Sequence, residues 1–148
     1  MHRIVRLIAL TAGLALAGAS VASAQSQPVF DMKGTWKGTA DAVVDGTTPQ
    51  HPPGAPSKPA GNYRLRTTAF TYQIDGQDGK RFWGTISSDL GPQRLIGSLS
   101  ADGKWIYIAG RDGILDGQPL DANTIDMCYR QVSANSAVIS CYEMKRQK

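Results

Sequence analysis

Apolar and polar residues alternate along most of the chain after residue 24, which is the pattern of half-buried β-strands. No stretch longer than a turn shows helical periodicity there, so we expect little helix. The short links between the alternating runs favour an antiparallel meander. The pattern predicts eight strands, at Gly34–Val44, Tyr63–Ile74, Lys80–Ser88, Gln93–Ser100, Lys104–Ala109, Gly113–Leu120, Thr124–Val132 and Ala137–Lys145.

Asp-Gly dipeptides border many of these runs and are strong signals for hairpin turns, because both residues tolerate a positive φ. Bound calcium is the alternative reading of such acidic loops, but their spacing matches neither an EF-hand nor a nonapeptide repeat. We therefore interpret the dipeptides as turns. They are Asp45-Gly46, Asp75-Gly76, Asp78-Gly79, Asp102-Gly103, Asp112-Gly113 and Asp116-Gly117.

Alternation also predicts which side chains point inward. Small residues such as Gly38 and Gly97 share the face of large apolar ones, which favours a small, sharply curved all-β barrel. Several aromatic side chains are expected on this inner face, where they either bind a small apolar ligand or simply fill the core. The candidate ligand-binding wall consists of Trp36, Phe70, Tyr72, Phe82, Tyr107, Tyr129 and Tyr142.

A proline-rich segment at residues 47–62 interrupts the meander and holds five of the eight prolines. Proline lacks the N–H that a sheet ladder needs, so we expect a long loop there. The loop either acts as a lid or partner-binding element or is disordered.

The first residues have the features of a secretory signal peptide. Arg3 and Arg6 precede an apolar run from Leu7 to Ala19, and Ala22-Ser23-Ala24 forms a small-residue cleavage site. A transmembrane anchor is the alternative, but the run is shorter than the roughly 20 residues that a span needs. We expect residues 1–24 to be removed, leaving residues 25–148 as one domain in the periplasm or outside the cell, without membrane insertion.

The formal net charge of +4 does not describe the body of the chain. Arg3 and Arg6 belong to the predicted signal peptide, and Lys145, Arg146 and Lys148 crowd the C-terminus. The remainder holds 11 basic and 12 acidic residues, with no basic stripe. Because nucleic-acid binding requires clustered Lys and Arg, we expect no nucleic-acid partner.

Cys128 and Cys141 are the only cysteines, and we expect them to form a disulfide. With Ala134-Asn135 at the tip of the last hairpin, the two cysteines lie directly opposite each other at a non-hydrogen-bonded pair. Their face also carries Asp126, Arg130 and Glu143, so the disulfide should lie outside the barrel. A redox-active pair is the alternative, but the spacing is not Cys-x-x-Cys.

Residues for catalysis are sparse after residue 24. His51 is the only histidine there, within the proline-rich segment, and Glu143 is the only glutamate. Nucleophilic triads and metal sites need converging partners that the sequence does not offer. We therefore expect no enzyme activity, no catalytic residue, no metal and no cofactor.

The segment Phe30–Trp36 reads FDMKGTW and resembles the Gly-x-Trp signature of the lipocalins and the Gly-Thr-Trp that opens the first strand of avidin-like proteins. Both belong to the calycins, so the resemblance implies an eight-stranded up-and-down barrel. It also implies that Trp36 closes one end, with a basic residue packed over it, either Arg146 or Arg130. Lys37 and Gly38 stand where avidins carry a biotin-binding Asn, so biotin binding is not implied.

Two functions follow from this pattern. The first is a non-enzymatic secreted or periplasmic barrel that binds a small apolar or amphipathic ligand. The second is a protein-interaction module, such as an inhibitor of a secreted hydrolase, with a core filled by side chains. In the second case the arm of residues 25–32 or the proline-rich loop is expected to act as the mobile contact element.

Overall fold

The structure is a computed structural model that describes residues 28–47 and 56–148. The described residues form nine antiparallel strands and no helix, as the alternating pattern predicts. The strands are β1 (Gly34–Gly46), β2 (Lys58–Ala60), β3 (Tyr63–Asp78), β4 (Arg81–Ser88), β5 (Gly91–Leu99), β6 (Ile106–Ala109), β7 (Ile114–Asp121), β8 (Thr124–Val132) and β9 (Ser136–Arg146). The predicted signal peptide and His51 lie outside the described residues.

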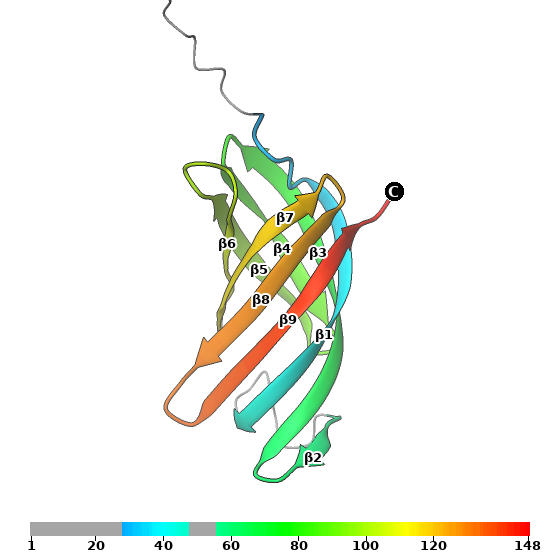
Figure 1. Cartoon of the computed structure of the whole chain (residues 1–148), viewed down its shortest axis with the longest axis vertical. Coiled ribbons are helices and arrows are strands. Elements are labelled where there is room, and N and C mark those ends of the chain that lie inside the picture. Colours follow the sequence, from blue (N-terminus) through cyan, green and yellow to red (C-terminus); the bar gives the residue numbers. More distant parts are fainter. Residues whose placement is uncertain (1–27, 48–55) are drawn as a thin grey trace, which may run out of the picture.

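Eight of these strands close into a barrel. Strands β3 to β9 pair in chain order, and β1 pairs with both β9 and β3, so no gap is left between the first and last strands (Figure 1). The predicted eight-stranded antiparallel up-and-down barrel is therefore confirmed. The strands are steeply staggered. A row of paired residues that starts at Gln77 of β3 and passes from strand to strand round the barrel returns to β3 at Arg66, so the two ends of the row lie far apart on the same strand. Such a barrel has an interior that side chains can fill or that can hold one small ligand.

The ninth strand corrects the expectation of a continuous loop at 47–62. Within that segment, Lys58–Ala60 forms β2, which pairs with the first residues of β3. Pro59 is tolerated because β2 has a partner on one side only, so its missing N–H breaks no ladder. Residues 48–55 lie outside the described residues.

The alternation correctly predicts the inner faces. Trp36, Ala40 and Val44 of β1 are all buried, whereas Lys37 and Asp41 on the opposite face are exposed. The core is a single cluster in which side chains from every strand of the barrel meet. Its largest fully buried members are Trp36, Tyr72, Phe82, Met32, Ile74, Leu95, Ile106, Ile125, Met127 and Met144.

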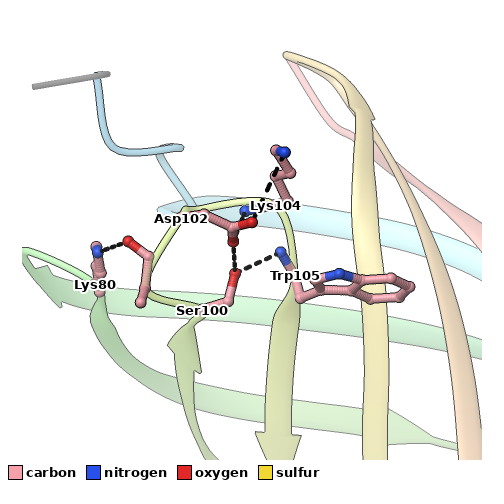
Figure 2. A network of polar contacts seen from close by, with 6 residues as sticks. Lys80, Ser100, Asp102, Lys104 and Trp105 are labelled. Carbon is pink, nitrogen blue, oxygen red and sulfur yellow. Dashed lines mark hydrogen bonds and ion pairs between the residues drawn. The ribbon is translucent and has the colours of Figure 1, made fainter.

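Strand β6 begins two residues later than predicted, because a polar network holds Lys104 and Trp105 in the preceding turn (Figure 2). Asp102 accepts hydrogen bonds from the Ser100 hydroxyl (2.6 Å) and from the Lys104 N–H (3.2 Å), and these hold the pKa of its carboxyl below the ordinary value. The Trp105 N–H donates to Ser100 Oγ, and Lys80 donates to the Ala101 carbonyl. Lys104 and Trp105 therefore belong to the turn and not to the strand that was predicted to contain them.

Only some of the Asp-Gly dipeptides form turns. Gly46 at the end of β1 and Gly79 and Gly103 in turns have a positive φ, and Asp112-Gly113 lies between β6 and β7. Gly76 and Gly117 instead lie inside β3 and β7. A Cβ at Gly76 would meet the Trp83 indole at 2.4 Å, and one at Gly117 would meet the Asp126 carbonyl at 2.0 Å. These two glycines allow close packing rather than chain reversal.

One end of the barrel is closed by the segment that precedes β1. Met32 is fully buried, and its carbonyl accepts a hydrogen bond from Trp36 Nε1 at 2.8 Å. The Arg146 guanidinium lies 4.2 Å from the centroid of the Trp36 ring and donates to the carbonyls of Asp31, Lys33 and Ala122. Arg146, rather than Arg130, is therefore the basic residue over the tryptophan. Phe30 packs against the core and Met32 is fully buried, so this part of the 25–32 arm is anchored and does not fit the expected mobile contact element.

The expected disulfide is present. Cys128 and Cys141 are direct partners in the β8–β9 ladder, and their Cα atoms lie 4.0 Å apart. This short separation is typical of the non-hydrogen-bonded pair that the hairpin count predicts. Cys141 is exposed, so the bridge lies outside the barrel, as expected.

Candidate functional site

The other end of the barrel holds a cavity of about 150 Å³. It is bordered by the turn between β4 and β5 and by the turn between β6 and β7. Both turns lie at the opposite end from the segment before β1 (Figure 1). The inner wall of the cavity is mainly apolar, and its apolar lining residues are Ala40, Ala42, Phe70, Ile86, Leu115 and Val138.

The structure places three of the seven predicted wall residues at this cavity, namely Phe70, Tyr129 and Tyr142. Three others are fully buried in the core outside the cavity lining, namely Trp36, Tyr72 and Phe82. The predicted wall is therefore divided: three of its aromatic residues line the cavity and three belong to the packed core.

Tyr107 was wrongly predicted to face the interior; half of its surface is exposed on the outer face. Strand β6 is apolar on both faces, so alternation alone did not decide its orientation. The structure turns Ile106 and Ile108 inward, where they lie opposite Gly117 and Gly97. The compact isoleucines fill the interior there, and the large Tyr107 ring lies outside.

Tyr142 lines the cavity and joins it to the packed core through Tyr72. The Tyr142 ring is stacked on Phe70 with 5.8 Å between centroids, and its hydroxyl forms a buried hydrogen bond with the Tyr72 hydroxyl. Burial raises the pKa of Tyr142 to about 12 and raises the pKa of Tyr72 well above its ordinary value. Both phenols are therefore neutral hydrogen-bonding groups at physiological pH.

Tyr129 forms part of the wall near the mouth. Its hydroxyl donates to Oε1 of the buried Gln131 at 3.0 Å. Partial burial, with a smaller contribution from the nearby Asp112 carboxylate, raises the pKa of Tyr129 to about 12. The wall thus offers a polar edge next to the apolar surface of Leu115.

Arg66 is the charged side chain buried most deeply in the described residues, with its side chain 4% exposed. Strand β3 runs beyond the end of β4 on this side, and Arg66 reaches across to Asp89 in the β4–β5 turn. Its Nη2 lies 2.9 Å and 2.7 Å from the two carboxylate oxygens of Asp89. The ion pair joins β3 to this turn at the mouth of the cavity.

Sequence reasoning missed Arg66, Gln131 and Ser140, which are all buried polar residues of this region. A signal for Arg66 was present, because it is an even number of residues from Phe70 and Tyr72 on the same strand. Its charge suggested an outward side chain, whereas its ion pair with Asp89 permits burial.

Other chemistry is limited in the part of the chain that the structure describes. Residues 28–47 and 56–148 contain no group of three or more His, Cys, Asp or Glu side chains arranged to hold a metal ion. Within the same ranges, no helix is long and apolar enough to cross a membrane.

Comparison with known proteins identifies no family for this chain. No family model matches it, and no curated protein matches it. Among solved structures, EF1p2_mFAP2b bound to DFHBI is similar over 78% of this chain and 93% of its own, at 11% identity and a TM-score of 0.44. The redesigned beta barrel b11L5F_LGL is similar over 78% of this chain and 91% of its own, at 12% identity and a TM-score of 0.40. Likeness at this level assigns no ligand to this chain.

Proposed function

We propose that this protein is a non-enzymatic barrel of calycin type that binds a small apolar or amphipathic molecule in the cavity at its open end. The observation that carries the proposal is a cavity of about 150 Å³ inside a barrel whose opposite end is closed by packed side chains. Apolar side chains cover its inner wall, and polar ones gather at its mouth. This distribution is typical of sites for small organic ligands.

The closed end supports the calycin assignment. The Gly-Thr-Trp sequence leads into β1, Trp36 is buried beneath the segment that precedes it, and Arg146 covers its ring. These are the features that the calycin resemblance implies. The resemblance concerns the architecture of the barrel, whereas the class of ligand depends on the cavity.

The size of the cavity limits the ligand. An engineered apolar cavity of comparable volume, about 150 Å³, binds benzene in another protein. A single ring or a short alkyl chain therefore fits inside the barrel, with any polar group at the open mouth. The rest of the interior is filled by the packed core, which includes Tyr72, Phe82 and Trp36. A long ligand therefore does not fit inside the barrel.

We further propose a periplasmic or extracellular location, with cleavage after Ala24. The external disulfide supports this proposal, because structural disulfides persist mainly in oxidising compartments. Mass spectrometry of the secreted protein tests it, since the mature chain should begin at Gln25. A chain that retains residues 1–24 would contradict it.

Native mass spectrometry of the mature chain, purified without denaturant, tests ligand binding directly. A co-purifying mass that is lost on unfolding is expected. Ala42→Phe should abolish it, because the new ring would fill the cavity that Ala42 lines. The matched control is Val43→Phe, whose side chain lies on the outer face of the same strand and should leave the mass unchanged. Equal loss from both variants would contradict a ligand in this cavity.

A second function, capture of a protein partner, is favoured by apolar side chains on the outer face. Trp83, Ile96, Tyr107 and Ile114 lie on four consecutive strands and are each about half or more exposed. Exposed apolar groups that lie together often mark protein contacts. Replacing Ile96 and Ile114 with Ser should remove partner capture and preserve cavity binding if this face is the functional one. The opposite result would support the cavity.

A further inference from the structure

The charged residues of the cavity are all at its mouth. Arg66, Arg111 and Asp112 line the opening, and Asp89 contacts Arg66 from the β4–β5 turn. Deeper in the barrel the lining is apolar except for hydroxyl groups. A ligand that enters would therefore place its apolar part inward and its polar group among these charges.

The two members of the ion pair at the mouth differ sharply in their environment. The Arg66 side chain is 4% exposed, whereas the Asp89 side chain is 51% exposed. A buried guanidinium requires an anionic partner, because water cannot solvate it in place. A half-exposed turn carboxylate can return to water at small cost, so Asp89 is the partner that can be exchanged.

We propose that the cavity takes a small amphipathic carboxylate whose carboxylate group replaces Asp89 on Arg66. Arg111 supplies a second cation at the mouth, and the apolar part of the ligand lies against Phe70, Ile86 and Leu115. Arginine suits this role because its planar group of donors matches a carboxylate. The inference rests on the proposed function and names the class of ligand for the same cavity.

The shape of the cavity narrows the class further. A volume of about 150 Å³ holds one aromatic ring or a short alkyl chain. Phe70 and Tyr142, whose rings stack with centroids 5.8 Å apart, both line the cavity, and aromatic lining favours a ring. An arylacetate is therefore a suitable probe.

The test compares three probes that share one phenylethyl framework and differ in charge: phenylacetate, 2-phenylethanol and 2-phenylethylammonium. Binding to the mature protein is measured by isothermal titration calorimetry at neutral pH. Phenylacetate is expected to bind about tenfold or more tightly than the alcohol, because it gains charged hydrogen bonds to Arg66. The ammonium compound should bind more weakly than phenylacetate, because a cation cannot replace Asp89 on Arg66.

Substitutions test whether Arg66 causes the expected preference for phenylacetate. Arg66→Gln should abolish the preference for phenylacetate over 2-phenylethanol, while Arg94→Gln, an exposed arginine on β5, should preserve it. Asp89→Asn removes the competing carboxylate charge and should tighten phenylacetate binding without changing the alcohol. This second variant retains the buried arginine, so it tests the exchange even if Arg66→Gln fails to fold.

The outcomes separate the two proposals. Equal affinity for phenylacetate and the alcohol would overturn the carboxylate inference and leave the binding cavity standing. Unchanged or weaker phenylacetate binding in Asp89→Asn would overturn the exchange at Arg66. If none of the probes binds and native mass spectrometry shows no co-purifying mass, the proposed function itself fails.

Discussion

At the scale of single residues, Arg146 connects three separate parts of the chain. Its guanidinium covers the Trp36 ring, donates to carbonyls in the segment before β1 and donates to Ala122 in the β7–β8 turn. The first contact is a cation–π interaction, and the others are charged hydrogen bonds. A single side chain thus holds the closed end together.

We expect Arg146→Ala to lower the free energy of unfolding by about 2 kcal/mol, because these contacts are lost together. Chemical denaturation monitored by tryptophan fluorescence measures the change. Arg146→Lys should recover only part of it, since lysine keeps the charge but not the planar group of donors. Arg94→Ala serves as the control, and an equal effect from it would argue against a special role for Arg146.

The buried tyrosines make stability depend on alkaline pH. An unfolded tyrosine loses its proton near pH 10.0, whereas Tyr129 and Tyr142 retain theirs to about pH 12 in the folded barrel. Between these values the folded state binds more protons than the unfolded state. Their contribution to the free energy of unfolding is therefore complete below pH 10.0 and falls as the pH rises toward 12.

Urea denaturation at pH 9, 10 and 11 measures this dependence. Stability should fall most steeply above pH 10, and Tyr142→Phe should make the fall shallower by removing one titrating group. A slope that is unchanged in Tyr142→Phe would show that other groups cause the loss.

Single residues also mark where prediction from sequence succeeded and failed at the site. Phe70, Tyr129 and Tyr142 were predicted and line the cavity. Tyr107 was misplaced because β6 is apolar on both faces, so alternation carries no information there. Arg66 was missed because burial of a charge depends on a partner from a distant turn, which local pattern does not show.

At the scale of elements, the β8–β9 hairpin is the best predicted part of the molecule. Its register follows from a two-residue tip, and the structure pairs Cys128 with Cys141 as expected, which also places Ile125 opposite Met144 and Met127 opposite Tyr142. A tight hairpin leaves one register that buries the apolar face. In contrast, β2 was not predicted, because a proline-rich segment has no alternation from which to infer a strand.

The disulfide on this hairpin should stabilise the whole barrel, although it lies outside the core. Replacing both Cys128 and Cys141 with Ala is expected to lower the free energy of unfolding by about 3 kcal/mol, as loop-closure entropy gives for a separation of 13 residues. Guanidinium denaturation compares the oxidised wild type with this variant. The reduced wild type should unfold at a midpoint close to that of the variant. A midpoint unaffected by reduction would contradict this expectation.

At the scale of the whole molecule, the two ends of the barrel differ in kind. Packed side chains and the segment before β1 close one end, and a cavity with charged residues at its mouth opens the other. Arg146 contacts residues of the closed end, and neither it nor the residues it contacts line the cavity. We therefore expect the Arg146→Ala variant to lose stability while its probe affinity, measured well below its unfolding midpoint, stays within about twofold of wild type.

Closure of the barrel through β1 and β9 also bears on how the molecule forms. Trp36 lies opposite Arg146, and Thr35 accepts a hydrogen bond from Gln147, so the wall is completed by residues from the two extremes of the domain. Pairing over such a long stretch of chain is entropically costly and slow compared with hairpin formation. The successive hairpins can form during synthesis, but the barrel can close only after β9 has been synthesised, because β1 pairs with β9. Closure of the native barrel therefore requires the whole segment from β1 to β9.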